Sequence, residues 1–421
     1  MCNFIDSAFY EITEETKECE TLIRSETSVR DDLRRWGITF GSAKCIYFEG
    51  HERPDVVQDR EIFVDYFLSR KENYYLIDSL DNKWIKPIEK PCVLMFHDES
   101  TFRCGEQLKK RWFKKGNEPF ISKGRGKSLM VSDFLISHPS GPFFSLNEVE
   151  WSECIEVYPE IQEYTGVNYI ERTCTGSIQP GQDNYFNSDT VLNQFERLFK
   201  MLQFKKDFVD GVKHDIEIVV DNARTHTAQV VHINDFCLKP GGNCPVDSID
   251  FTDDKGIDRT ILCYDEDGVS KGLKKIAFEL GYENLPIKTS LKQLKDILIL
   301  HPAFSPVKKL SKLAEKYGVK IIYCPKFHCE LNPIEGQWCS QKGYIRKRTD
   351  QTYIRLISLL NESRTHFIQS KLANKLLLRF WNCLHGYKNK KSYGEIIIQY
   401  FSGKSKGKNE SHTKVSNSQI C

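Results

Sequence analysis

The chain has 421 residues, of which 28% are charged, 40% are hydrophobic and 12% are aromatic. A composition of this kind belongs to folded globular proteins, and at roughly 150 residues per domain the length allows about two or three domains. It excludes a small disulfide-stapled scaffold and a chain that is disordered throughout. The longest apolar runs, such as 216–220 and 396–398, fall far short of the roughly 20 residues that cross a membrane, so we expect no membrane partner.

The N-terminus and the cysteines both indicate an intracellular protein. The first 20 residues carry five Glu and one Asp, the opposite of the basic and then apolar pattern of a secretion leader. The 15 cysteines are odd in number, scattered along the chain and without a CxxC pair, which favours reduced thiols. A zinc site is the alternative for four residues whose spacing matches none of the compact zinc motifs: His232, Cys237, Cys244 and Cys263.

The charge is unevenly distributed along the chain, although the whole chain carries only +2. Residues 301–421 hold 22 Lys and Arg against 7 Asp and Glu, a formal charge of +15, whereas residues 1–300 hold 38 against 51, a charge of −13. Concentrated positive charge attracts the phosphates of nucleic acids, but a solvated helix face also accumulates lysine. On charge alone, both interpretations of the C-terminal third stay open.

The N-terminal 90 residues give one clear structural signal. Residues 28–36 predict a short amphipathic helix, with Ser28 as its N-cap and Gly37 just past its end. Residues 38–90 mix aromatic and charged side chains without a helical or strand period, which predicts irregular structure. We therefore expect residues 1–90 to form an N-terminal region that contains a small helical element and a linker.

Three strands are predicted next, and the first of them leads to an acidic residue. Residues 92–96 form a continuous apolar run that stops at polar residues 97–100, which is typical of a buried central strand that ends in a loop. Asp98 would therefore follow the end of that strand. Residues 128–136 and 142–149 predict two further strands, and the short connections favour an antiparallel meander.

A helix and a fourth strand lead to a second acidic residue. Apolar residues at three- and four-residue spacing predict a helix over 188–208, capped by Ser188. The β-branched run at 216–220 predicts a strand that continues directly into Asp221. Residues 227–306 are then loop-like and acidic, and we expect them to form an insertion.

The C-terminal part supplies a third acidic residue at the start of a helix. A helix over 307–317 and a strand over 319–323 precede Asn332 and Pro333, the residue types that begin helices, so Glu335 would lie in a first helical turn. Basic helices are predicted beyond it, and the Ser, Lys, Gly and Asn of residues 401–421 predict a disordered tail.

Asp98, Asp221 and Glu335 together have the placements of a two-metal site. Carboxylate oxygens select hard ions such as Mg²⁺ or Mn²⁺, and two such ions can stabilise the attacking and the leaving oxygen of a phosphoryl displacement. The alternative is that each acid is an ordinary strand-end or helix-start residue, since Glu near a helix N-terminus is favoured by the helix dipole.

Whole motifs around these acids resemble mariner-type transposases of the DDE endonuclease superfamily. The resemblance covers about residues 28–400, and residues 50–57 resemble the segment before the catalytic domain in an insertion-bearing branch of that family. Four segments carry it: FHDESTF at 96–102, KGRGKSLMVSDF at 123–134, VVDNARTH at 219–226 and YCPKFHCELNPIEGQW at 323–338.

The resemblance implies an α/β, ribonuclease-H-like fold whose mixed sheet is flanked by helices. The catalytic domain would span 91–400 with the insertion at 227–306, and the predicted N-terminal helix would be a remnant of the helix-turn-helix domain of the family. Asp98, Asp221 and Glu335 would be the catalytic triad and would bind two Mg²⁺ or Mn²⁺ ions.

Other residues in these motifs receive secondary roles. The resemblance assigns no catalytic role to Glu99, which would point away from Asp98, or to Asp133, which we expect to be structural. Three residues near the acids in sequence would support the site from a second layer: Asn222, His226 and His328.

The activity that the resemblance implies is metal-dependent cleavage of DNA followed by strand transfer, as in a cut-and-paste transposase. The partner would be double-stranded DNA, both transposon ends and target, in the nucleus, with a homo-oligomer assembled on the DNA. Four residues that continue the helix of Glu335 would contact phosphates: Lys342, Arg346, Lys347 and Arg348. The alternative is a transposase-derived DNA-binding or chromatin-associated protein that does not cleave.

Overall fold

The computed structural model divides the chain into two compact units, residues 1–49 together with 406–421, and residues 50–405. It describes residues 2–36, 50–107, 124, 126–180, 185–244, 246–253, 256–282, 285–286, 288–305 and 307–401. Gly37 and the predicted tail beyond Phe401 therefore lie outside the described residues. No described helix has the length and apolar character to cross a bilayer.

The described residues of the first unit contain two helices, α1 (Cys2–Thr13) and α2 (Glu26–Arg35). The predicted helix is present as α2, but Ser28 is not its cap. Ser25 adopts the extended cap conformation, and its hydroxyl accepts a hydrogen bond from the Ser28 backbone amide at 3.2 Å. Two serines three residues apart are both acceptable caps in sequence, and backbone geometry chooses the earlier one.

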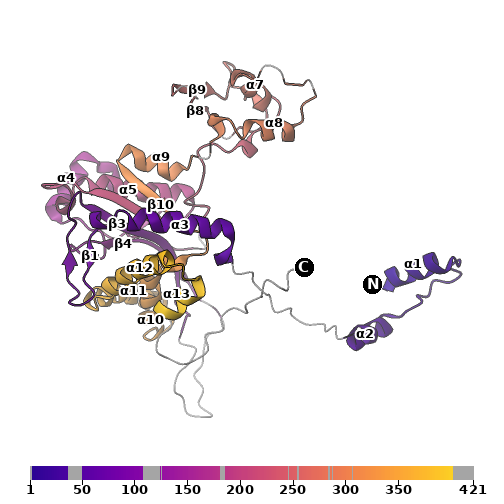
Figure 1. Cartoon of the computed structure of the whole chain (residues 1–421), viewed down its shortest axis with the longest axis horizontal. Coiled ribbons are helices and arrows are strands. Elements are labelled where there is room, and N and C mark those ends of the chain that lie inside the picture. Colours follow the sequence, from indigo (N-terminus) through magenta and orange to yellow (C-terminus); the bar gives the residue numbers. More distant parts are fainter. Residues whose placement is uncertain are drawn as a thin grey trace, which may run out of the picture. The chain divides into compact units, whose positions relative to one another are not determined.

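A six-stranded mixed sheet forms the centre of the second unit (Figure 1). Its middle strand β3 pairs antiparallel with β4 and parallel with β7, β7 pairs parallel with β10, and β6 and β5 extend the antiparallel side. An antiparallel meander with two parallel strands added beside its first strand is the ribonuclease-H-like arrangement, so the predicted fold class is confirmed. The strand order is β10 (Val319–Tyr323), β7 (Asp215–Val220), β3 (Cys92–Arg103), β4 (Ser128–Ser137), β6 (Gly176–Ile178) and β5 (Asn168–Tyr169).

The third strand of the meander is not where the sequence predicts it. Residues 142–147 form no strand, and helix α4 (Glu148–Val157) starts where the predicted strand would end. A capping box fixes that start, because Asn147 Oδ1 accepts from the Glu150 amide at 2.9 Å and Glu150 Oε2 accepts from the Asn147 amide at 2.8 Å. The meander is completed instead by β6, whose three residues are too few for a recognisable pattern.

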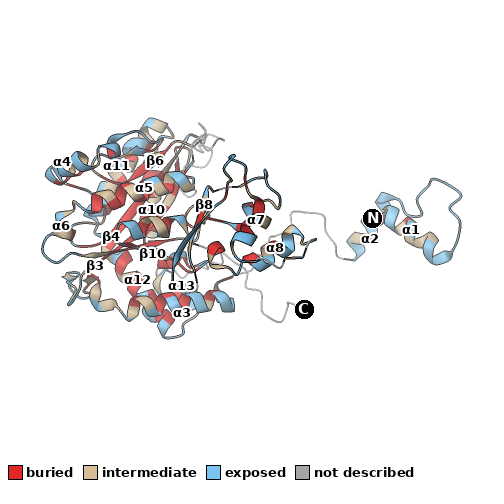
Figure 2. Ribbon diagram, turned by 90° about the horizontal axis from the view of Figure 1, so that it is seen from above, coloured by how far each residue is buried: buried red, intermediate tan, exposed pale blue. Residues whose placement is uncertain are grey.

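Helices cover both faces of the sheet and enclose two separate apolar cores (Figure 2). Alternate residues of β3 face opposite cores, with Leu94 and Phe96 in one and Val93 and Met95 in the other. The first core is covered by α3 (Pro54–Leu68), α10 (Ile334–Arg346), α11 (Tyr353–Gln369), α12 (Leu372–Lys388) and α13 (Tyr393–Tyr400). The second is covered by α4, α5 (Ser188–Leu202) and α9 (Lys309–Lys316).

Helix α3 shows that the core begins before residue 91. Phe63, Val64 and Phe67 are buried in the first core, in a segment predicted to be irregular. The buried Glu217 of β7 reinforces this attachment, since it accepts hydrogen bonds from the hydroxyls of Tyr66 and Tyr74, each at 2.6 Å. The compact unit therefore starts at Gly50. The helix was missed because charged residues on its exposed face interrupt the apolar pattern.

The insertion between β7 and β10 has an apolar core of its own. That core includes Ile249, Leu273 and Leu294, from β8 (Ser248–Thr252), β9 (Asp258–Leu262), α7 (Gly272–Glu279) and α8 (Leu291–Leu298). The acidic run thus contains a β-hairpin that its loop-like composition did not predict. The two ends of the insertion are joined, because the Val230 amide donates to the Val307 carbonyl at 2.9 Å and the Lys309 amide to the Ala228 carbonyl at 2.8 Å.

Candidate functional site

Asp98 and Asp221 come from neighbouring parallel strands at the same edge of the sheet. The pairing of β3 with β7 ends at Phe96 and Val219, so both acids lie just beyond its last pair. The prediction that Asp98 follows the end of its strand is wrong, because β3 continues against β4 as far as Arg103. Polar residues usually end an apolar strand, but here antiparallel pairing carries the strand through them.

Helix α10 brings Glu335 to the same place. The Trp338 indole Nε1 donates to Asp98 Oδ2 at 3.0 Å, and the Asn332 amide Nδ2 donates to the His97 carbonyl at 3.2 Å. These bonds tie the first turn of α10 to β3 at Asp98. Asn332 was predicted as the helix cap, but its side chain bonds β3 instead, and the helix begins after Pro333.

The three carboxylates lie close enough to influence one another electrostatically. Burial, then the charge of Glu335 and other neighbouring acids, raises the pKa of Asp98 to about 8. The pKa of Glu335 is also raised, by burial and by Asp221 against the opposing charge of Lys342. Burial would raise the pKa of Asp221 too, but the hydrogen bond from His226 outweighs it and the pKa falls. Mutual repulsion of this kind favours a bound cation.

Asp221 and Glu335 line one pocket of about 390 Å³ that suits hard cations. In the described part of the chain, no side chain bonds the Glu335 carboxylate, and Asn332 Oδ1, also in this pocket, is buried without a partner. Asp98 does not line this pocket, but its pKa responds to the charges of Glu335 and Asp221. The donors of the set are all carboxylate or amide oxygens, the ligands that Mg²⁺ and Mn²⁺ prefer. The residues therefore fit the predicted metal ions.

The raised pKa of Asp98 predicts that Asp98→Asn stabilises the protein in a chelating buffer. Between the unfolded pKa, about 3.9, and the folded pKa, the native state binds a proton that the unfolded chain does not. The free energy of unfolding of the wild type therefore falls as pH rises through this range. The Asn variant does not show this fall, because its side chain does not titrate. We expect its advantage in urea unfolding with EDTA to grow by about 1 kcal/mol or more from pH 5 to pH 8. A difference independent of pH would contradict the assignment.

His226 contacts Asp221 and fixes the position of its carboxylate. It is fully buried, and its Nδ1 lies 2.5 Å from Asp221 Oδ1, while its Nε2 lies 3.5 Å from Glu99 Oε1. Burial would lower the pKa of His226, but the hydrogen bond to Asp221 and the nearby Glu99 carboxylate raise it to about 9. Glu99 and Asp98 are adjacent in β3 and so face opposite sides of the sheet, which agrees with the expectation that Glu99 is not a triad member.

His328 and Asn222 hold the backbone around the pocket. His328 is buried, its Nδ1 lies 2.6 Å from Glu330 Oε1, and the Tyr387 hydroxyl donates to the same oxygen at 2.6 Å. Asn222 donates its side-chain amide to the Cys324 carbonyl. The structure therefore gives both residues partners within the protein, although both line the pocket.

Asp133 is the register partner of Asp98 across β3 and β4, but its side chain bonds other residues. It is buried, and its carboxylate forms an ion pair with Arg364 of α11. It also accepts hydrogen bonds from Thr175 Oγ1 at 2.8 Å and Gln337 Nε2 at 3.3 Å. Asp133 therefore joins β4 to α10 and α11, in line with the structural role expected of it.

The four basic residues predicted to contact DNA have different surroundings. Lys342 lies near Glu335, whose pKa its charge lowers. Arg346 forms an ion pair with Glu106 at 2.8 Å, and the Arg348 guanidinium lies 3.8 Å from the centre of the Tyr344 ring. Lys347 is exposed. Arg346 and Arg348 would have to give up these contacts to bind DNA, so only part of the set is available to a new partner.

Two lysines that the sequence did not single out lie beside the pocket. Lys326 lines it, and Lys308 lines an adjoining pocket of about 390 Å³ that shares Asn222, Cys324 and Pro325. Burial and the charge of Lys326 lower the pKa of Lys308. Among the described residues, no carboxylate lies within ion-pair distance of either lysine. Residues 18 positions apart give no sequence signal that they meet.

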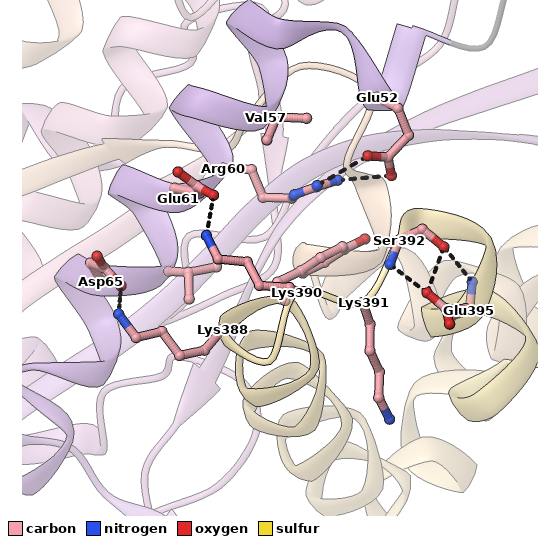
Figure 3. Close-up of a pocket in the computed structure, with 12 residues that line it drawn as sticks. Glu52, Val57, Arg60, Glu61, Asp65, Lys388, Lys390, Lys391, Ser392 and Glu395 are labelled. Carbon is pink, nitrogen blue, oxygen red and sulfur yellow. Dashed lines mark hydrogen bonds and ion pairs between the residues drawn. The ribbon is translucent and has the colours of Figure 1, made fainter.

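A further pocket, of about 350 Å³, lies between α3 and the C-terminal helices but lacks the features of a reactive site (Figure 3). Most of its charged side chains already form ion pairs within the protein. The ion pairs are Arg60 with Glu52 at 3.2 Å, Lys388 with Asp65 at 2.6 Å and Lys390 with Glu61 at 2.6 Å.

The zinc alternative for His232, Cys237, Cys244 and Cys263 finds no support in the described residues. One group of three or more potential ligands comes together there, and it consists of His97, Glu99 and His226. Cys244 donates its thiol to the Val246 carbonyl at 3.3 Å instead.

No protein-family model and no curated protein matches the chain. Among solved structures, it is similar to complexes of the Mos1 mariner transposase. The paired-end complex with Mn is 12% identical, with 92% of this chain and 78% of that chain covered and a TM-score of 0.39. The strand-transfer complex is 13% identical, with 93% and 79% covered and a TM-score of 0.37. The metal and assembly states in these descriptions are properties of those proteins.

Proposed function

We propose that this protein cleaves phosphodiester bonds of double-stranded DNA and transfers the cut strand, as a cut-and-paste transposase of the DDE type. Asp98, Asp221 and Glu335 are the proposed catalytic residues. One observation carries the proposal: three carboxylates from β3, the end of β7 and the start of α10 converge at one edge of a ribonuclease-H-like sheet.

The three carboxylates would hold two Mg²⁺ or Mn²⁺ ions. When bound, such ions lower the pKa of the attacking water or hydroxyl and neutralise charge on the leaving oxygen. The residues of the chain supply position. Trp338 fixes one oxygen of Asp98 by its indole hydrogen bond, and His226 fixes one oxygen of Asp221, which lines the pocket. No covalent enzyme intermediate is required.

The proposed DNA path crosses the pocket between two groups of basic residues. On one side are Lys308 and Lys326, which lack acidic partners among the described residues. On the other are the last turns of α10 and the two residues after it, namely Lys342, Arg346, Lys347 and Arg348. Lys308 lies 3.1 Å from the centre of the Tyr323 ring, but positive charge without an acidic partner near the carboxylates still favours a phosphate backbone. The proposal includes both transposon ends and target DNA, a homo-oligomer on DNA and action in the nucleus.

The salt dependence of DNA binding tests this path. If Lys308 and Lys326 each neutralise one phosphate, the Lys308→Ala, Lys326→Ala double variant should flatten the plot of log affinity against log salt by about 1.8 units. The matched control is Lys388→Ala, Lys390→Ala, which removes the same charge from lysines already paired with Asp65 and Glu61. Equal changes of slope in both double variants would mean that DNA binding depends on the total charge of the protein and not on a defined path.

The activity itself is tested by nicking of supercoiled plasmid DNA by the full chain. We expect nicking with Mg²⁺ or Mn²⁺ and none with EDTA. Tight DNA binding without nicking in either metal would favour the alternative, a transposase-derived DNA-binding protein without catalytic activity.

A further inference from the structure

On the face of β3 opposite Asp98, three side chains that can bind a metal ion come together. They are His97 and Glu99 of β3 and His226 from the segment after β7, and one ligand atom of each lies within 4.8 Å of the other two. Both imidazoles are fully buried. Among the described residues, three of their atoms have no hydrogen-bond partner: His97 Nδ1, Glu99 Oε1 and His226 Nε2.

The hydrogen bonds around His97 leave a lone pair on its Nδ1. Gln194 Nε2 donates to the Cys174 carbonyl at 2.8 Å, which fixes Gln194 Oε1 as an acceptor. The Ser132 hydroxyl donates to that oxygen at 2.8 Å, so it must accept from His97 Nε2, which lies 2.8 Å away. The proton of the neutral imidazole is then on Nε2, and Nδ1 carries a lone pair into the cluster.

The same reasoning applies to His226. Its Nδ1 lies 2.5 Å from the Asp221 carboxylate, which can only accept when ionised, so Nδ1 is the donor. Nε2 is then the nitrogen that a metal ion would bind in place of a second proton, and it lies 3.5 Å from Glu99 Oε1. Two imidazole nitrogens and a carboxylate oxygen thus lie in one buried cluster, which either a second proton on His226 or a metal cation would satisfy.

We propose that His97 Nδ1, Glu99 Oε1 and His226 Nε2 bind one divalent transition-metal ion of the zinc class, separate from the ions of the carboxylate site. Two imidazoles and one carboxylate are a ligand set that zinc takes, with the fourth position left to water. Ligands of a tetrahedral zinc ion are about 3.3 Å apart for bonds of about 2.0–2.1 Å. The separation of 3.5 Å between His226 and Glu99 already approaches this value.

The surroundings of the cluster also fit a metal ion. Metal-bound histidines usually donate their second ring nitrogen to an oxygen acceptor, which is what His97 does to Ser132 and His226 does to Asp221. The charge of a divalent ion would be balanced by the carboxylates of Glu99 and Asp221, so no net charge would be buried. Through His226, the ion would also hold Asp221 in its orientation.

A proton is the competing occupant. A second proton on His226 would pair with Glu99, but it would leave His97 Nδ1 buried without a partner. One metal ion satisfies all three atoms. The metal content of the protein therefore distinguishes the two occupants.

The test measures zinc in the full chain, expressed in zinc-supplemented medium, purified without a metal-affinity step and dialysed against metal-free buffer. We expect about one equivalent of zinc per chain by mass spectrometry. The variants Glu99→Gln and His97→Gln should lose it. The control Asp98→Asn should retain it, because Asp98 lies on the other face of β3, and Cys263→Ser should retain it because the thiols are not ligands.

A second measurement uses only the wild-type protein, so it does not depend on whether the variants fold. Removal of zinc from the wild type with a strong chelator should lower its Tm, and added Zn²⁺ should restore it while added Mg²⁺ should not. Wild-type protein without zinc, with a Tm unaffected by the chelator, would overturn the proposal. So would zinc retained in Glu99→Gln and lost in Cys263→Ser. Protein that contains zinc but nicks no DNA would contradict only the proposed function.

Discussion

Asp221→Asn, Asp98→Asn and Glu335→Gln are each expected to lower metal-dependent nicking of plasmid DNA by about 1,000-fold or more. Each variant removes one carboxylate charge from the proposed two-metal site, and such a site contributes several kcal/mol of charge stabilisation in the transition state. Initial rates of nicking with Mn²⁺, measured at equal protein and DNA concentrations, give the comparison directly.

The control for this experiment is Asp247→Asn, an exposed acid in the insertion. Its activity should stay near that of the wild type. Circular dichroism of all four variants separates lost chemistry from lost folding, since Asp98→Asn should melt no lower than wild type in EDTA. Full activity of Asp221→Asn would show that the carboxylates are ordinary strand-end and helix-start acids.

Asp133→Ala is expected to destabilise the protein by about 3 kcal/mol. Loss of one partner of a buried ion pair leaves the other charge uncompensated, which typically costs about 3–5 kcal/mol. Arg364, with 17% of its side chain exposed, can recover some hydration, which places the expected cost at the lower end. Urea unfolding at pH 7 measures the change in the free energy of unfolding.

A double-mutant cycle shows whether the pair is responsible. Arg364→Ala alone should also be destabilising, because it removes the contact of the guanidinium with the Phe143 ring, 3.6 Å from the ring centre, as well as the ion pair. The double variant should be less destabilised than the sum of the two single variants. Additive effects would mean that Asp133 stabilises the sheet mainly through Thr175 and Gln337.

Much of the sheet could be predicted because its central strands are apolar and short-range patterns identify them. β4, β7 and β10 lie where the sequence predicts strands. α3 and β6 could not be predicted in the same way. The apolar face of α3 is recognisable only once the core that it covers is known. β6 is held by pairing with β4, and of its three residues only Ile178 favours a strand by itself.

The candidate site was predictable in its residues but not in its geometry. The motifs identified Asp98, Asp221 and Glu335, and the structure brings them to one edge of the sheet, while their catalytic role stays a prediction. The placement of Asp98 within β3 depends on pairing with β4, which no local pattern reveals. The approach of Lys308 to Lys326, and of His226 to His97 and Glu99, depends on how distant segments fold back on the sheet.

Because the two ends of the insertion are paired with each other, the length of the insertion does not affect the geometry of the carboxylate site. Although Glu335 comes 114 positions after Asp221, the Ala228–Lys309 and Val230–Val307 hydrogen bonds bring the departing and returning chain to the spacing of adjacent strands, about 4.8 Å. The sheet therefore meets the insertion only as a narrow stem. Segments of very different size could be carried on that stem during evolution without moving the second acid relative to the third.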